Sequence, residues 1–124
     1  QGNDCEKKMG LFPSINFQSN SSKLLPDAKK MLESVAFKLR NNPSCKIVVT
    51  GYGNNSKTTQ QRSWDHVNTV INYLVETQGI DRDRCIFYYG SDAGLPTMTD
   101  IRAARPDEEG PSSVPPPFPA LRKK

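Results

Sequence analysis

Residues 45–90 read CKIVVTGYGNNSKTTQQRSWDHVNTVINYLVETQGIDRDRCIFYYG, and this stretch decides the fold. Segment 46–52 is rich in β-branched residues and segment 84–90 is apolar, so each predicts a strand. The apolar residues between them recur at helical spacing: Val67, Val70, Ile71 and Leu74. A helix between two apolar strands predicts a crossover that joins parallel strands. The turn at 51–55, which leaves the first of these strands, is where such folds commonly bind ligands.

The rest of the chain supplies further elements. A short strand is predicted at 15–17, where apolar and polar residues alternate. Pro26 suits the first turn of a helix that ends before Pro43, with an apolar stripe along it. Residues 97–103 predict a final strand that turns back beside the third strand, because the link before it is short and turn-rich. The expected fold class is therefore α+β: a two-layer β-α-β-α-β-β sandwich in which a mixed four-stranded sheet carries two helices on one face.

Composition divides the chain into three parts. Residues 1–10 are polar and are expected to be poorly ordered, 11–104 form the domain, and 105–124 are a Pro-rich, basic-ended tail. The tail has few apolar residues to bury, so a linker outside the core is expected. Its segment 115–119 also fits a ligand for an aromatic groove, although a plain spacer is favoured.

The charge pattern narrows the function classes. The chain carries a net charge of +4, but its positive residues are scattered and form no basic stripe with interleaved aromatic residues. Nucleic-acid binding is therefore not expected. No apolar run is long enough to cross a bilayer, so no transmembrane segment is predicted in this chain.

The sequence contains three cysteines. Cys45 and Cys85 each begin a predicted strand, so they lie at the same end of the sheet if those strands are parallel. Two interpretations stay open: a disulfide between them, which suits an oxidising compartment, or two small buried hydrophobic side chains. Cys5 is expected to be an unpaired thiol. Without a Cys-x-x-Cys pair, neither a cysteine-based metal site nor a cofactor is predicted.

An ordered set of motifs resembles the OmpA-like (OmpA/MotB) C-terminal domain over roughly residues 11–104. The motifs are Ile15-Asn16-Phe17, Leu24-Leu25-Pro26-Asp27-Ala28, Asn42-Pro43, Lys46-Ile47-Val48-Val49-Thr50-Gly51, Val70-Ile71-Asn72-Tyr73-Leu74, Gly79-Ile80-Asp81-Arg82-Asp83-Arg84, Tyr89-Gly90 and Pro96. The resemblance implies a non-catalytic periplasmic domain, associated with the outer membrane of a Gram-negative envelope, that binds peptidoglycan.

The family's binding motifs are altered here. Its Gly-His-Thr-Asp becomes Gly51-Tyr52-Gly53-Asn54, and the arginine of its next helix aligns with His66. In the family that Asp and that Arg hold the diaminopimelate of the peptidoglycan stem peptide, so the resemblance gives these roles to Asn54 and His66. Arg62 lies one helical turn before His66 and is a candidate substitute.

Three further residues complete the predicted ligand-binding site: Tyr52, Asn55 and Ser63. Replacing a carboxylate by an amide and a guanidinium by an imidazole removes two charge-assisted bonds, so weakened or altered diaminopimelate recognition is expected.

Two alternatives remain to be weighed. Ser63, Asp65 and His66 suggest a catalytic triad, but Asp65 points away from the face that the other two share, so no enzymatic activity is predicted. The leading hypothesis is a domain that associates with peptidoglycan or tethers an outer-membrane assembly to the cell wall. The alternative is a degenerate OmpA-like scaffold that binds a protein partner in an envelope complex.

Overall fold

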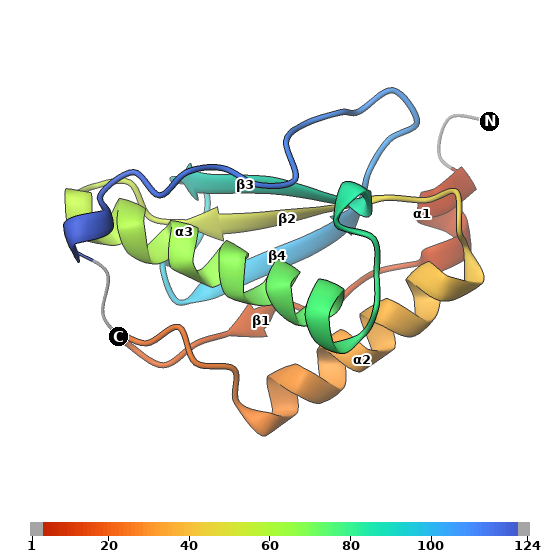
Figure 1. The fold of residues 1–124 in the computed structure, drawn as a ribbon, viewed down its shortest axis with the longest axis horizontal. Coiled ribbons are helices and arrows are strands. Elements are labelled where there is room, and N and C mark those ends of the chain that lie inside the picture. Colours follow the sequence, from red (N-terminus) through yellow and green to blue (C-terminus); the bar gives the residue numbers. More distant parts are fainter. Residues whose placement is uncertain (1–3, 122–124) are drawn as a thin grey trace.

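The computed structural model describes residues 4–121 and shows the predicted α+β architecture (Figure 1). Its elements, in chain order, are α1 (Asp4–Met9), β1 (Ile15–Asn16), α2 (Pro26–Asn41), β2 (Ile47–Tyr52), α3 (Lys57–Asn72), β3 (Cys85–Ser91) and β4 (Met98–Ala103). A π-helical turn at Tyr73–Thr77 continues α3, and 3-10 turns lie at Arg82–Arg84 and Pro119–Leu121. The predicted mixed sheet with helices packed on it is confirmed.

The sheet has the strand order β1-β4-β2-β3. β2 pairs with β3 in parallel, which confirms the predicted crossover, and β4 pairs antiparallel with both β2 and β1. The prediction that the last strand lies beside the third was wrong, because β2 lies between them. The link after β3 crosses the end of β2, and there Gly94 packs on the ring of Tyr52: a Cβ on Gly94 would lie 2.9 Å from that ring. A short link thus does not require a hairpin.

Helices α2 and α3 pack on the same face of the sheet (Figure 1). Their apolar stripes meet the inward side chains of β2, β3 and β4 in one core: Leu32, Val35, Leu39, Ile47, Val49, Val67, Val70, Ile71, Cys85, Phe87 and Ile101. At Gly51 the contact between α3 and β2 is especially close. A Cβ there would lie 2.7 Å from the Ser63 carbonyl oxygen and from Val67 Cγ2, so only glycine fits without moving the helix.

The N-terminal segment differs from expectation. Residues 4–9 form α1, with Asp4 and Glu6 in the first turn and lysines in the last, an arrangement that favours the helix dipole. Met9 is 2% exposed and belongs to the core. Gly10 has a positive φ of 72°, and its N–H donates to the Glu6 carbonyl, which ends the helix.

The cysteine prediction also needs correction. Cys5 and Cys45 form a disulfide that joins α1 to the start of β2, so Cys5 is not an unpaired thiol. Cys85 is a free, buried cysteine, as the second interpretation of Cys45 and Cys85 expected for it, and the disulfide between those two is wrong. This error follows from the expectation that residues 1–10 are poorly ordered, because an unordered segment offers no fixed partner for Cys45.

The tail also lies closer to the domain than expected. Residues 111–118 run along the edge of β3 and past α3, and Val114 packs against the core. A linker apart from the core is therefore wrong for this segment. The division into 1–10, 11–104 and 105–124 stays a prediction.

The disulfide should contribute substantially to stability. It closes a loop of 40 residues, for which chain entropy predicts about 4 kcal/mol of stabilisation. Cys5→Ser should lower the free energy of unfolding by that order, measured by guanidinium titration. Adding reductant should destabilise the wild-type chain and the matched Cys85→Ala control, but not Cys5→Ser. Equal sensitivity of Cys5→Ser to reductant would contradict this assignment.

Candidate functional site

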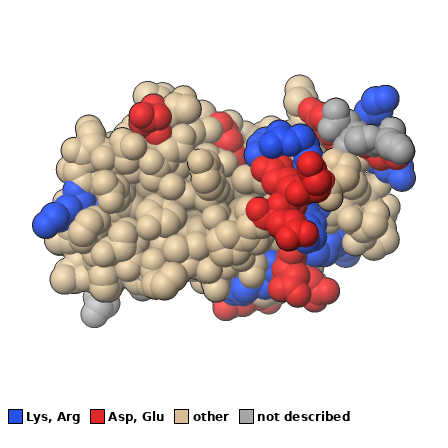
Figure 2. Space-filling view, turned by 90° about the horizontal axis from the view of Figure 1, so that it is seen from above, with Lys and Arg blue, Asp and Glu red and all other residues tan. Residues whose placement is uncertain are grey.

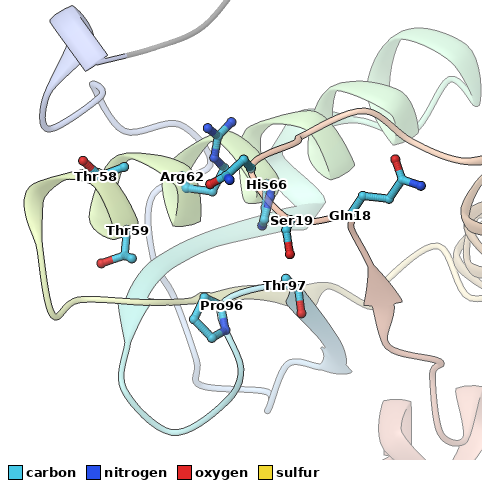
Figure 3. A pocket seen from close by; sticks show the side chains of 9 residues that line it. Gln18, Ser19, Thr58, Thr59, Arg62, His66, Pro96 and Thr97 are labelled. Carbon is cyan, nitrogen blue, oxygen red and sulfur yellow. The ribbon is translucent and has the colours of Figure 1, made fainter.

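A cavity of about 260 Å³ opens beside the first half of α3. Its walls come from three segments: the loop that follows β1, the first turns of α3, and the turn before β4 (Figure 3). The lining residues are Gln18, Ser19, Asn20, Thr58, Thr59, Arg62, His66, Pro96 and Thr97. Most of these residues carry a hydroxyl or amide group, one carries a guanidinium and none is acidic, although the surface that they present to the cavity is mainly apolar. The guanidinium suits the cavity to a ligand that carries a negative charge.

Ser56 fixes the start of α3 at this cavity. Its side chain accepts a hydrogen bond from the Thr59 N–H, and Thr59 Oγ1 accepts one from the Ser56 N–H, which together form a capping box. Thr59 Oγ1 also lies 2.8 Å from Asn55 Oδ1, to which it donates. The cap explains why the helix begins at Lys57, and it places Thr58 and Thr59 on the cavity wall.

His66 is the buried polar group of the site, with 1% of its surface exposed. Its ring stacks on Phe17, with centroids 3.9 Å apart and planes inclined by 3°. Nε2 lies 2.7 Å from the Ser21 carbonyl oxygen. Since a carbonyl only accepts, Nε2 must carry the hydrogen, and Nδ1 is left as an acceptor. Nδ1 has no hydrogen-bond partner among the described residues.

The imidazole is neutral at pH 7. Burial lowers its pKa from 6.5 to about 4, the Ser21 carbonyl partly opposes this shift, and the charge of Arg62 adds to it. His66 therefore cannot supply the positive charge that the family's arginine brings to this helix position. Its remaining acceptor, Nδ1, is neutral and buried.

Arg62 carries the positive charge of the cavity. It lies one turn before His66 on α3 and is partly exposed (Figure 3). Among residues 4–121 it has no ion-pair partner. Its guanidinium is thus available to a carboxylate, which it can bind through two parallel hydrogen bonds.

Asn54 and Asn55 lie in a neighbouring hollow of about 280 Å³, which shares Pro96 with the cavity. Asp92 and Gly94 complete its rim with Gly53. The main-chain carbonyl of Asn54 accepts a hydrogen bond from Gln60 Nε2. The structure therefore brings Arg62 and His66 together but places Asn54 and Asn55 next to them, across the rim.

The other two predicted residues do not line the cavity. Ser63 is fully buried, and its Oγ accepts a hydrogen bond of 2.8 Å from the Gly90 N–H, so it braces the irregular end of β3. Tyr52 lies on the face of the sheet away from the helices, where its hydroxyl donates to Asp100 Oδ2. Burial, followed by this bond to Asp100, raises the pKa of Tyr52 to about 12.

The three side chains that suggested a catalytic triad form hydrogen bonds with different groups. Ser63 meets Gly90, His66 meets Ser21, and Asp65 Oδ1 accepts from Gln61 Nε2 at 3.0 Å. No serine–histidine–aspartate relay is therefore formed by these three residues. In the part of the chain that the structure describes, no group of three His, Cys, Asp or Glu residues could hold a metal ion.

Sequence reasoning missed several lining residues. Gln18, Ser19 and Asn20 follow β1, whereas Pro96 and Thr97 precede β4. These segments meet because β1 and β4 are neighbours in the sheet. A correct prediction of the strand order would have identified them.

The model of the OmpA family matches residues 16–105. The chain belongs to the OmpA family. No curated protein matches the sequence.

Solved OmpA-like domains share the fold at low sequence identity. The OmpA-like domain of FopA1 from Francisella tularensis aligns with a TM-score of 0.60 and 16% identity, covering 76% of this chain and 74% of that one. The peptidoglycan-associated lipoprotein of Burkholderia pseudomallei aligns with a TM-score of 0.61 and 12% identity, covering 73% of this chain and 89% of that one. The C-terminal domain of Helicobacter pylori MotB aligns with a TM-score of 0.61 and 14% identity, covering 75% of this chain and 84% of that one. At these identities the likeness shows the fold alone.

The neutral state of His66 makes stability depend on pH. The folded state binds a proton only near pH 4, whereas the unfolded chain binds one near 6.5, so stability is fully present above pH 6.5 and falls toward pH 4. The loss should reach about 3 kcal/mol. His66 is the only histidine in the sequence, so its NMR titration is directly readable.

We expect the free energy of unfolding to decrease between pH 6.5 and 5 in the wild-type chain and to vary much less in His66→Gln, measured by guanidinium titration at each pH. An imidazole that titrates near 6.5 in the folded wild-type chain would contradict this expectation.

Proposed function

We propose that this OmpA-family chain is a non-catalytic domain of the bacterial envelope that associates with peptidoglycan, or tethers an outer-membrane assembly to it. The ligand is a carboxylate of the stem peptide, bound in the cavity beside Arg62. The observation that carries the proposal is the guanidinium of Arg62, which has no ion-pair partner among residues 4–121, in a cavity at the start of α3 that no acidic residue lines.

Three further features support it. The cavity lies beside the corner between the end of β2 and the start of α3, the position that the family resemblance indicates for ligand binding. One relative of similar fold is named a peptidoglycan-associated lipoprotein. The disulfide between Cys5 and Cys45 suits an oxidising compartment such as the periplasm.

The recognition differs from that of a site with one acidic and one basic residue. An ammonium group of the ligand would meet no carboxylate in this cavity, because Nδ1 of His66 is buried and Asn54 lies in the neighbouring hollow. A neutral hydroxyl or amide oxygen can still accept from the ammonium, but without the attraction between opposite charges that a carboxylate adds. The carboxylate contact with Arg62 therefore dominates, and recognition of diaminopimelate is weakened or altered.

No membrane-spanning helix occurs in the described range 4–121.

Titration with soluble muropeptides tests the proposal. Arg62→Ala should weaken binding by about tenfold to a hundredfold, because a charge-assisted pair to a carboxylate is lost. Lys29→Ala is the matched control: it removes one positive charge from the exposed side of α2, outside the cavity, and should leave the affinity unchanged. Isothermal titration calorimetry at low salt gives both affinities.

Equal affinity of Arg62→Ala and wild type would show that the cavity does not hold the carboxylate. Absence of binding by the folded wild-type chain would defeat peptidoglycan association itself.

The alternative is a degenerate scaffold that binds a protein partner in an envelope complex. The placement of Asn54 outside the cavity and the burial of His66 favour it, because the two positions that the family uses for its ligand do not face one space. A scaffold would not be retained on purified sacculi at low salt. Retention that Arg62→Ala abolishes and Lys29→Ala preserves would exclude this alternative.

A further inference from the structure

The Pro-rich tail is held along the outer edge of the domain by main-chain contacts. The Phe87 N–H, on the edge strand β3, donates to the Pro111 carbonyl at 2.7 Å. The Trp64 indole N–H donates to the Val114 carbonyl at 2.6 Å, and the Phe118 N–H donates to Gln61 Oε1 at 2.8 Å. Figure 1 shows this dark-blue segment passing above β3 toward the beginning of α3.

The groups that hold the tail are themselves fixed. Gln61 is 1% exposed, and its Nε2 donates to Asp65 Oδ1, which leaves Oε1 to accept from the tail. The Trp64 ring lies against Phe87, with centroids 5.7 Å apart. The Trp64 indole N–H and the Gln61 carboxamide oxygen therefore have fixed positions about one turn apart on α3, next to the outer edge of β3. We call this surface, formed by Gln61, Trp64 and Phe87, the tail-binding face.

The tail matches this face through its backbone conformation. Val114, Pro115 and Pro116 each precede a proline, which restricts all three to extended or polyproline II geometry. A polyproline II segment makes no internal hydrogen bonds, so its carbonyls are free to accept from a tryptophan N–H. Aromatic surfaces with such donors are a recurring way to bind proline-rich peptides.

The docked segment and the three residues of the tail-binding face are uncharged. Residues 110–121 contain no charged side chain. Figure 2, which views this edge from above, shows a broad tan surface, with acidic and basic side chains gathered toward the other end. Lys57 Nζ lies 5.7 Å from the Phe118 ring centroid. A suitable ligand is therefore an uncharged, extended peptide with an aromatic residue after its prolines.

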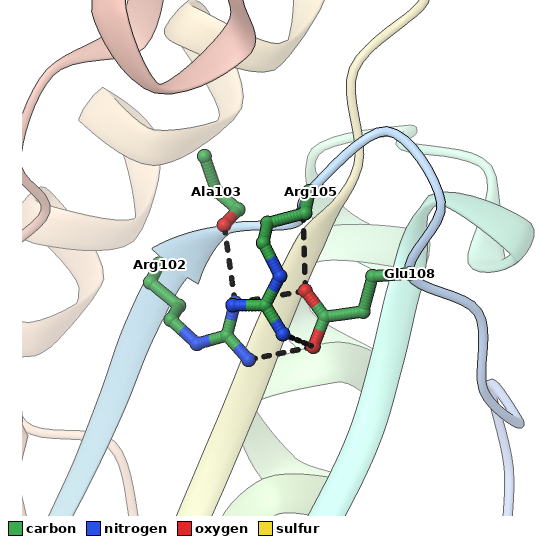
Figure 4. A network of polar contacts seen from close by, with 4 residues as sticks. All are labelled: Arg102, Ala103, Arg105 and Glu108. Atoms are coloured by element: carbon green, nitrogen blue, oxygen red, sulfur yellow. Dashed lines mark hydrogen bonds and ion pairs between the residues drawn. The ribbon is translucent and has the colours of Figure 1, made fainter. Parts of the chain in front are cut away.

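The tail is tethered independently of these contacts. Arg102 on β4 binds both carboxylate oxygens of Glu108, at 2.9 and 2.6 Å, and Glu108 also accepts from the Arg105 N–H (Figure 4). The bond to Arg102 lowers the pKa of Glu108 to about 2, so this anchor persists at neutral pH. A hollow of about 390 Å³ lies between the tether and the sheet. The contacts within 102–108 therefore use other residues than those that hold segment 111–118.

We propose that the tail-binding face is a binding site for uncharged, extended proline-rich peptides, and that residues 111–118 occupy it intramolecularly. A partner protein with a segment of the same chemistry would replace the tail. Because the tether raises the local concentration of the tail, a free peptide competes poorly until the tail is weakened.

The test uses the full chain and a synthetic peptide of residues 110–121. Replacing the three prolines (Pro115→Gly, Pro116→Ser, Pro117→Gly) removes the extended preference of the tail and leaves the tail-binding face intact. This variant should bind the peptide at least about tenfold more tightly than the wild-type chain does, measured by fluorescence anisotropy. Adding Trp64→Phe, which keeps a ring but removes the N–H, should weaken that binding by about tenfold.

Equal, undetectable binding by the wild-type chain and the folded tail variant would overturn the proposal, as would tight binding that Trp64→Phe leaves unchanged. A concentration-dependent dimer of the wild-type chain would overturn the intramolecular assignment. If the tail variant does not fold, hydrogen exchange of the Trp64 indole N–H in the wild-type chain decides. Strong protection supports the docked tail, and exchange at the rate of a free indole refutes it.

Discussion

The close contact between Gly51 and α3 is the constraint on which the rest of the structure depends. The missing side chain of Gly51 lets the Ser63 carbonyl and the Val67 side chain approach the backbone of β2. Helix α3 therefore packs close to the sheet. This contact sets the distance from the sheet and the direction of each functional side chain on the helix. The inner side of α3 braces the end of β3 through Ser63, one flank carries Arg62 and His66, and the outer side carries Gln61 and Trp64.

The two proposed ligand surfaces therefore share one helix. On the cavity side Arg62 and the buried, neutral His66 line a space of about 260 Å³. On the other side a carboxamide oxygen and an indole N–H hold the backbone of the tail. Both depend on buried polar groups with fixed partners: Asp65 orients Gln61, and the Ser21 carbonyl orients His66. Such groups are costly to bury unless they are bonded, so their partners define one arrangement.

Much of the fold could be predicted from the sequence, since strand and helix periodicities are local properties. β2, α2, α3 and β3 follow from such patterns. The position of β4 could not, because a short link permits either a hairpin or a step across one strand. The helix α1 and its disulfide were also missed. A polar segment of six helical residues gives almost no periodic signal, and its order depends on Met9 and Cys5 finding distant partners.

The candidate site was predicted in part for the same reason. Arg62 and His66 share a helix face, which spacing alone reveals, and both line the cavity. Ser63 also lies near that face, but its distance from the sheet depends on the contact at Gly51, which only the packed structure shows. The loop residues that complete the cavity required the strand order.

Substituting Gly51 by alanine is the most direct test of this account, with guanidinium unfolding and the NMR titration of His66 as joint readouts. The added Cβ should push α3 from the sheet and lower the free energy of unfolding by about 1–3 kcal/mol. It should also raise the pKa of His66 from about 4 toward 6.5, as the imidazole loses its burial. A variant with wild-type stability and an unchanged His66 titration would contradict the account.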